Sequence, residues 1–411
     1  MMPELFTVLT PQDALRKLFD HLPGHVAAES IPISEALDRV IAESPIAPGP
    51  LPSFTRSTMD GYAVRAADTF GASESLPAYL TVIGESPMGR APIFEIGKGQ
   101  AAIIHTGGML PSGADSVVMI ERTQKARENE IEVLRSVAVG ENVIQIGEDI
   151  KPGEALLPIG HRLRPQDLGG LAATGIMHVS IAKRPSVAIL ATGDEVVPAD
   201  AEPAPGQVRD VNTYTIAGLV ERAGSIPLPR GIVPDRFDAL YQAARAALDE
   251  SDVLVLSAGS SVSVRDMTSD VIDRLGKPGV LVHGVSLKPG KPTILAVCDG
   301  KPVFGLPGNP VSAMVVAGLF ITPTLWRMQG LAQRMQYQSI RARLARNVAS
   351  TPGREDYLQV KLVERDGEVW AEPIFGKSNL IYTLVKADGL MVVPLDANGV
   401  QEGETVEVRM F

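Results

Sequence analysis

Two lysines in the stretch SLKPGKPTI, residues 286–294, are the first side chains that suggest binding chemistry. Lys288 and Lys291 lie on a backbone restricted by two prolines and a glycine, in a chain whose formal net charge is −10. Two ammonium groups held this close repel each other, so a site that fixes both is typical of anion binding. Phosphate, pyrophosphate or a metal oxyanion would neutralise both charges. Taken alone, the stretch fits a lysine-bearing surface turn equally well.

The segment FGLPGNPVSAM, residues 304–314, predicts a tight turn at which a strand passes into a helix. Such a turn exposes backbone N–H groups at the positive end of the helix, and Ser312 adds a hydroxyl in the first helical turn. An ordinary connection would use Gly or Asn alone, so two prolines around Gly-Asn indicate a preorganised nest for a phosphate or an oxyanion. Its turn residues are Pro307, Gly308, Asn309 and Pro310. We expect Lys288 and Lys291 beside it, because the short strand after them pairs naturally with the next.

Acidic residues follow several of the other predicted strands. Asp194 and Glu195 fit a solvated loop, and Asp235 and Asp266 fit helix caps, if each is considered by itself. Together at one sheet edge beside the lysines, these carboxylates suit Mg²⁺, which takes one or two carboxylates plus substrate phosphates. Metal and lysines together predict a site for a phosphoanhydride.

Two further turns carry polar residues without an evident partner. Asp60 lies in RSTMDGYAVR, which predicts a hairpin held by an Asx-turn, and Thr106 precedes Gly107-Gly108 on a permissive turn. Spacing alone assigns neither residue to a site.

The elements that must position the lysines and the nest lie between about residues 183 and 330. Apolar β-rich runs alternate there with helical patterns, which predicts a mostly parallel α/β sheet. The candidate residues come directly after strands, and in an open α/β sheet such positions gather at the carboxyl edge, where ligands bind.

The remaining chain is largely β-rich. Residues 55–145 predict an inserted small β domain, and residues 336–411 a compact β-barrel or sandwich. Residues 1–54 and 146–182 would form an N-terminal helix and a mixed linking domain that pack together. Thr10 is the predicted cap of that helix, whose apolar face carries Leu15, Leu18, Phe19 and Leu22.

Composition excludes several classes of protein. A chain of 411 residues is expected to hold about two to four domains. Its 48 acids against 38 bases disfavour a general nucleic-acid binder. The single Cys298 cannot form an intramolecular disulfide or a thiolate metal cluster, and it follows an apolar run as a buried thiol would. Without a signal-peptide pattern or about 18 uninterrupted apolar residues, we expect a cytoplasmic protein with no membrane span.

Six groups of motifs in one order resemble the MoeA and gephyrin E-domain family of molybdopterin molybdenumtransferases over nearly the whole chain. They are STMDGYAVR, HTGGMLPSGADSVVMIE, ATGDEVV with GQVRDVNTY, SLKPGKPT, VFGLPGNPVSAM and ADGLMVVP. The resemblance implies an elongated homodimer of four-domain subunits whose central α/β domain is similar to MoaB and MogA. It also implies that adenylylated molybdopterin and molybdate, with Mg²⁺, give molybdenum cofactor and AMP at a site shared between subunits.

The resemblance also implies roles for matching residues. Asp60 and Thr106 would reach the site from the β domain, and Glu195, Asp235 and Asp266 would supply its acidic, metal-binding edge. The phosphate and molybdate pocket would contain Lys288, Lys291 and the nest with Ser312. Arg354 in GREDY and Ser378 in GKSNL match more loosely and would contact the oxyanion from the fourth domain. The residues that would carry out catalysis are Asp60, Thr106, Glu195, Asp266, Lys288 and Lys291. None of them would act as a nucleophile, because catalysis would rest on electrostatic positioning.

One segment departs from the family pattern. Where a glycine-rich GGVSVG is usual, this chain has AGSSVSVRDMTSD, with Ser260 and Ser261 replacing glycine and Arg265 at another glycine position. The extra bulk and charge could alter the fit of nucleotide or pterin. The matching acid is Asp266 or, as the alternative, Asp270.

Three other functions remain open from the sequence. A nucleotidyltransferase that uses ATP would share the phosphate loop, but the extra β domains and MDGYAVR favour metal insertion. A non-enzymatic scaffold would have no need for so many converging charges. Tungstate, an almost isosteric oxyanion, could replace molybdate.

Overall fold

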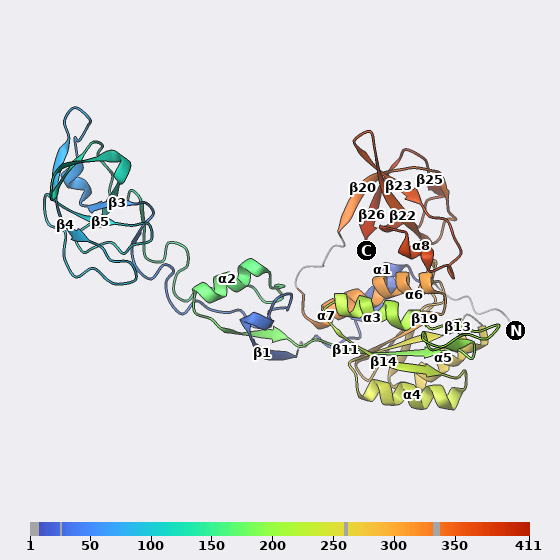
Figure 1. Cartoon of the computed structure of the whole chain (residues 1–411). Coiled ribbons are helices and arrows are strands. Elements are labelled where there is room, and N and C mark those ends of the chain that lie inside the picture. Colours follow the sequence, from blue (N-terminus) through green and yellow to red (C-terminus); the bar gives the residue numbers. More distant parts are fainter. Residues whose placement is uncertain (1–7, 25–26, 259–261, 332–337) are drawn as a thin grey trace.

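The computed structural model describes residues 8–24, 27–258, 262–331 and 338–411. The molecule is elongated (Figure 1). The inserted β domain lies at one end, the α/β domain and the C-terminal β domain lie together at the other, and the segment that carries α2 and β1 connects them.

The α/β domain is built on a six-stranded sheet in the order β14-β11-β15-β19-β18-β16. β14, β11, β15 and β19 are parallel neighbours, whereas β18 runs antiparallel to both β19 and β16. The mostly parallel sheet predicted from the sequence is therefore confirmed. Its strands are β11 (Ser186–Thr192), β14 (Ile226–Val233), β15 (Val253–Ala258), β16 (Pro278–His283), β18 (Ile294–Cys298) and β19 (Lys301–Pro307), and a small β12 (Val196–Val197) to β13 (Val208–Arg209) pair lies in the loop after β11.

Helices cover both faces of this sheet because alternate residues of the strands point to opposite sides. Val187 and Ile189 of β11 pack with one set of helices, and Ala188 and Leu190 pack with the other. The first set comprises α1 (Pro11–Phe19), α3 (Asn212–Arg222), α6 (Pro310–Val316), the π-helical turn η4 (Ala317–Ile321) and α7 (Thr322–Met328). The second comprises α4 (Phe237–Asp249) and α5 (Val262–Leu275).

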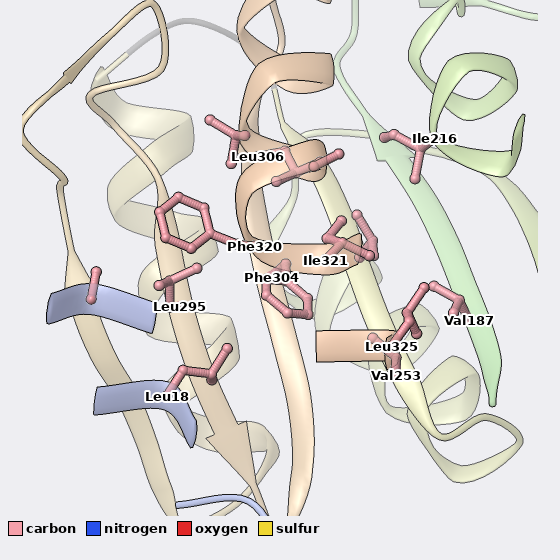
Figure 2. Packing of buried hydrophobic residues seen from close by; sticks show 14 of the residues in the cluster. Leu18, Val187, Ile216, Val253, Leu295, Phe304, Leu306, Phe320, Ile321 and Leu325 are labelled. Carbon is pink, nitrogen blue, oxygen red and sulfur yellow. The ribbon is translucent and has the colours of Figure 1, made fainter. Parts of the chain in front are cut away.

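Phe304 and Phe320 are the largest fully buried side chains, and they occupy the centre of the first core (Figure 2). Leu18 of α1 packs into the same core beside Leu295. Thr10 caps α1 as predicted, since its Oγ1 accepts a hydrogen bond from the N–H of Asp13.

The position of α1 differs from the expectation that the N-terminal segment packs with residues 146–182. Lys17 Nζ donates to the carbonyl of Leu281 at 2.8 Å, and Leu9 forms a β-bridge with Val285. The apolar face of α1 is buried as predicted, but against the α/β sheet. An amphipathic pattern predicts that one face of a helix is buried, but it does not identify the surface that covers that face.

The strand-to-helix segment after β19 continues as one helix from Pro310 to Met328. Among the described residues, this helix is long and apolar enough to cross a membrane by length and composition. However, 61% of its most apolar 18-residue stretch is buried inside the protein. Val316, Phe320 and Leu325 belong to the core of the α/β domain. We interpret it as a core helix.

The inserted β domain contains a six-stranded sheet in the order β6-β3-β5-β4-β8-β7. Its elements are β3 (Gly61–Val64), η2 (Ala66–Thr69), β4 (Ala78–Glu85), β5 (Gln100–Ile104), β6 (Ser116–Met119), η3 (Ile120–Arg122), β7 (Thr123–Arg127) and β8 (Glu130–Val133). The linking segments contain β1 (Ala28–Pro32), η1 (Ile33–Glu35), α2 (Pro165–Ala173) and β10 (His178–Ala182), and β2 (Arg56–Ser57) pairs with β9 (Val143–Ile144) where the chain enters and leaves the β domain.

The C-terminal domain is a closed five-stranded barrel, as the sequence predicts, because β22 pairs with β24 and completes the ring β22-β23-β20-β26-β24. A sixth strand, β17 (Leu287–Lys288), comes from the α/β domain and pairs in parallel with β22. The other elements are β20 (Ser339–Leu344), β21 (Val348–Ala349), β22 (Glu355–Arg365), β23 (Glu368–Pro373), α8 (Tyr382–Val385), β24 (Gly389–Val393), β25 (Gly399–Val400) and β26 (Thr405–Met410).

Candidate functional site

Polar residues gather where β14, β11, β15 and β19 end side by side. Asp235 follows β14, Thr192 ends β11, Ser257 lies near the end of β15, and Gly308 follows β19. Because these four strands are parallel neighbours, their carboxyl ends form one edge of the sheet. The sequence-based expectation that strand-end residues share one edge is met for these positions.

The acidic part of this edge is ordered by short hydrogen bonds. Thr192 Oγ1 donates to Asp235 Oδ1 at 2.6 Å, and the N–H of Asp235 donates to Asp194 Oδ1 at 3.1 Å. Glu195 is exposed, and its carboxylate folds back against Gly193, where an added Cβ would lie only 2.9 Å from Oε2. The absence of a side chain at Gly193 therefore leaves room for the Glu195 carboxylate.

Asp266 and Asp270 lie on α5 and are exposed. Ser260 and Ser261 lie outside the described residues, as does the side chain of Arg265. Within the described part of the chain, no three His, Cys, Asp or Glu side chains group closely enough to hold a metal ion by themselves. The metal set predicted from the sequence, Glu195 with Asp235 and Asp266, therefore stays a prediction that needs substrate oxygens as further ligands.

The nest forms between β19 and α6. Pro307 is the last residue of β19, and Pro310 is the first of α6. Gly308, Asn309 and Pro310 are half-buried, whereas Ser312 is buried at 4% exposure. The turn is therefore open to a ligand at its backbone, while the Ser312 hydroxyl lies beneath that surface.

The lysine turn packs directly on the helix that follows the nest. Gly290 has φ +120°, and an added Cβ would lie 2.5 Å from Val316 Cγ2 and 3.7 Å from the Ser312 carbonyl oxygen. Only glycine permits this approach without strain. The turn that carries the exposed Lys288 and Lys291 thus lies beside α6, and the position of the two lysine side chains at the nest itself stays a prediction.

Asp356 is a site residue that sequence reasoning missed. Its side chain is 4% exposed, and its Oδ1 accepts a 2.8 Å hydrogen bond from Arg354 Nε. Its Oδ2 lies 3.8 Å from Lys288 Nζ. One buried carboxylate therefore holds cations from the α/β domain and the barrel. The available signal was its place two residues after Arg354 in GREDY.

Ser378 also brings the C-terminal domain to the nest. Asn309 Nδ2 donates to Ser378 Oγ at 2.9 Å, and the N–H of Val311 donates to the Ser378 carbonyl at 3.1 Å. The α/β domain and the C-terminal domain therefore meet through two contacts, Lys288 with Asp356 and the nest with Ser378.

Asn212 begins α3, and its side chain reaches the nest. Nδ2 donates to Ser257 Oγ and to the carbonyl of Gly308, each at 2.8 Å. No local pattern in the sequence predicts a bond between residues this far apart.

Asp60 and Thr106 are close to each other but belong to the inserted β domain. The N–H of Thr106 donates to Asp60 Oδ1 at 3.0 Å, just before β3 and just after β5. Both strands lie at the opposite end of the molecule from the α/β domain (Figure 1). Within one chain, the structure does not bring these two residues to the nest.

His105 lies beside Asp60 and was not singled out from the sequence. Its Nε2 is 2.9 Å from Glu85 Oε1, and its Nδ1 is 3.5 Å from Asp60 Oδ1. The hydrogen bond with Glu85, followed by the smaller contribution of Asp60, raises the pKa of the imidazole above its ordinary value. The side chains of His105, Glu85 and Asp60 therefore form one exposed cluster.

Cys298 is buried as predicted and hydrogen-bonds to the Ile272 carbonyl. Burial raises the pKa of its thiol to about 12, so the thiolate form needed for nucleophilic attack is not populated at neutral pH.

Known proteins match this chain along almost its whole length. Three family models match consecutive parts: the "MoeA N-terminal region (domain I and II)" at residues 9–175, the "Probable molybdopterin binding domain" at 188–327, and the "MoeA C-terminal region (domain IV)" at 341–411. A molybdopterin molybdenumtransferase of Nostoc sp. is 33% identical over 396 residues, which are 95% of this chain and 90% of that protein. One of Haemophilus influenzae is 32% identical over 407 residues, or 98% and 99% of the two chains.

A solved structure has the same arrangement of domains. The crystal structure of the molybdopterin biosynthesis MoeA protein from Pyrococcus horikoshii superposes with a TM-score of 0.85 at 37% identity, covering 98% of this chain and 99% of that one. The chain therefore belongs to the MoeA family of molybdopterin molybdenumtransferases.

Proposed function

We propose that this protein is a transferase of molybdenum cofactor biosynthesis that inserts molybdate into adenylylated molybdopterin and releases AMP. The observation that carries the proposal is that Lys288, on a turn that packs against the helix following the nest, shares the buried Asp356 carboxylate with Arg354, in a chain of net charge −10. Cations that converge on exposed backbone N–H groups favour a phosphate or an oxyanion. The family relationship supports this substrate class.

The side chains would act by positioning and charge stabilisation. Lys288 and Lys291 would balance the negative charge of the phosphoanhydride, and N–H groups of the nest would donate hydrogen bonds to the oxyanion oxygens. Cleavage of the anhydride P–O bond by water would release AMP. As the two dithiol sulfurs bind molybdenum, one molybdate oxygen would leave as water with the two thiol protons. No protein nucleophile enters this scheme, which agrees with the buried, high-pKa thiol of Cys298.

Mg²⁺ fits the acidic edge. Glu195 is exposed on a loop that Gly193 leaves uncrowded, and the Asp235 carboxylate is oriented by Thr192. These two carboxylates, together with phosphate oxygens, are the ligand set that Mg²⁺ prefers. Asp266, or Asp270 as the alternative, would complete the edge. When bound, the ion would neutralise charge on the leaving phosphate.

A second copy of the chain would complete the site. Asp60 and Thr106 lie at the far end of the molecule from the nest (Figure 1). The exposed apolar side chains of Met59, Met88 and Ile120 lie in the same domain and could contact a partner. We therefore propose a homodimer in which the inserted β domain of one subunit reaches the α/β domain of the other. A cytoplasmic location stays a prediction.

The test is AMP release from adenylylated molybdopterin by the purified protein with Mg²⁺, with molybdate, with tungstate and without either. We expect release that depends on the oxyanion, and the two rates rank the metals. Substrate that stays bound without release would contradict the transferase and support a binding role. Formation of adenylylated molybdopterin from ATP and molybdopterin would instead support nucleotidyl transfer.

A further inference from the structure

Asn212 occupies a buried position beside the ends of β15 and β19. It is the first residue of α3 and is 6% exposed. Its Nδ2 donates one hydrogen to Ser257 Oγ near the end of β15 and the other to the Gly308 carbonyl after β19, each at 2.8 Å. Both hydrogens of one primary amide nitrogen are therefore used by the protein itself.

The bond to Gly308 determines which way the nest faces. The Gly308–Asn309 peptide is trans, so its C=O and its N–H point in opposite directions. When Asn212 holds the Gly308 carbonyl, the N–H of Asn309 must point away from α3. The nest residues Asn309 and Val311 are held on their other side by Ser378.

We infer that Asn212 is a positioning residue of the anion site, which aims the N–H groups of the nest by anchoring the Gly308 carbonyl to the end of β15. The inference rests on the proposed function, because it concerns how the nest binds phosphate and oxyanion. Asn212 acts through the Gly308 peptide, because both of its donors are occupied and its Oδ1 is buried without a hydrogen-bond partner among the described residues. To hold Ser257 Oγ and the Gly308 carbonyl at once, one short side chain must supply two donors. Ser, Leu and Asp cannot supply them.

The decisive variant is Asn212→Leu, which keeps a similar shape and removes both donors without adding charge. Asn212→Asp is less informative, because its negative charge would repel an anion in any case. A freed Gly308 peptide can rotate, and small errors in donor placement are costly in a preorganised site. We expect kcat/KM for oxyanion-dependent AMP release to fall by about tenfold to a hundredfold.

The matched control is Tyr214→Ala on the same helix, whose side chain is 67% exposed. It should leave kcat/KM unchanged. The second measurement is the dissociation constant of AMP, determined by calorimetry on protein whose thermal unfolding shows that it is folded at the assay temperature. We expect weaker AMP binding in Asn212→Leu and unchanged binding in the control.

Ser257→Ala tests the route of the effect. It removes one of the two acceptors of Asn212, so we expect a smaller loss of kcat/KM than in Asn212→Leu. Because Ser257 would act through Asn212, the double variant should be no worse than Asn212→Leu alone. Losses that multiply would show that Ser257 acts independently of Asn212, and would contradict the inferred route.

The outcomes separate this inference from the proposed function. If wild-type protein releases no AMP, the proposed function fails whatever the variants do. If wild-type protein is active and folded Asn212→Leu keeps wild-type kcat/KM and AMP affinity, with only a lower Tm, Asn212 is merely structural and the inference is wrong.

Discussion

At the scale of single residues, a buried acid lies within a site proposed for anions. Asp356 holds Arg354 through a 2.8 Å hydrogen bond and lies 3.8 Å from Lys288 Nζ. A buried carboxylate must be paired, and here the pairing aligns two cations from different domains before any anion arrives. Lys288 keeps a 60% exposed side chain and is therefore accessible to an anion.

Replacing Lys288 by alanine should impair turnover without unfolding the protein. Its ion pair with Asp356 is 3.8 Å long and its ammonium side is exposed, so it contributes little stability, and Arg354 still pairs with the buried Asp356. We expect AMP release to fall by about tenfold to a hundredfold, with Tm nearly unchanged. Lys125→Ala, which removes the same charge from the inserted β domain, is the control. Equal turnover in both variants would show that Lys288 does not serve the site.

The His105 imidazole should titrate above the ordinary histidine pKa near 6.5, because Glu85 and then Asp60 stabilise its charged form. Its favourable contribution to stability is present below the unfolded pKa and is lost as pH rises through the folded pKa. An NMR titration of the ring should show this shift, and Glu85→Gln should lower the pKa. Glu128→Gln on the β7–β8 hairpin is the control. A titration midpoint that Glu85→Gln leaves unchanged would contradict the assignment.

At the scale of elements, β17 joins two domains by main-chain pairing. Leu287 and Lys288 lie opposite Glu355 and Asp356 in the barrel sheet. The lysine turn is therefore held between this pairing and the contact of Gly290 with α6. Both contacts use the backbone of the turn and neither uses a lysine side chain, so they position the turn whatever the lysine side chains do.

The start of helix α2 is held by the carboxylate of Asp167. Its carboxylate accepts hydrogen bonds from the side chain and N–H of Arg164 and lies 2.7 Å from His161 Nε2. The bond from Arg164 holds the pKa of Asp167 well below its usual range, so its stabilising contribution is present above about pH 4 and is lost as pH falls toward the folded pKa.

Asp167→Asn should therefore destabilise the protein by about 1–3 kcal/mol at pH 7. Thermal unfolding at pH 7, 5 and 3 should show a lower Tm for the variant than for wild type, and this difference in Tm should narrow only at the lowest pH. Asp149→Asn, at an exposed residue of the same linking region, is the control. A difference that is constant with pH would exclude the charge of Asp167 as the cause.

At the scale of the whole molecule, the separation of the inserted β domain from the nest is the main functional constraint (Figure 1). Because of this separation, the proposed site, which needs Asp60 and Lys288 together, must combine two chains. A closed dimer would form such a site twice, because each subunit presents the same two surfaces to the other.

Mixing two inactive variants tests this arrangement. Asp60→Asn and Lys288→Ala homodimers should each be impaired, whereas dissociated and reassociated mixtures should recover about a quarter of wild-type AMP release. Half of the dimers are then mixed, and one of their two sites is intact. Mixing each variant with itself is the control. No recovery despite mixed dimers detected by distinct affinity tags would contradict a shared site, and a monomer by light scattering would do so directly.

Much of the fold could be predicted because its signals are local. The alternation of strands with helices, the Thr10 cap and the Pro-Gly-Asn-Pro turn each depend on residues close in sequence. The candidate site was predicted where residues directly follow strands, as Gly308 and Asp235 do. Asp356 was not predicted because the segment GREDY pointed to Arg354 as the oxyanion contact. The predicted packing partner of α1 was wrong because an amphipathic pattern does not identify which surface covers its apolar face.

By itself, the sequence determined which chemical groups are available and which local turns present them. Only the tertiary structure decided which of these groups meet. Asn212 bonds to Gly308 across 96 positions and Asn309 to Ser378 across 69, whereas Asp60 lies at the far end of the same chain. Turn geometry follows from neighbouring backbone angles, but contacts between distant segments depend on how whole domains pack, which no local pattern encodes.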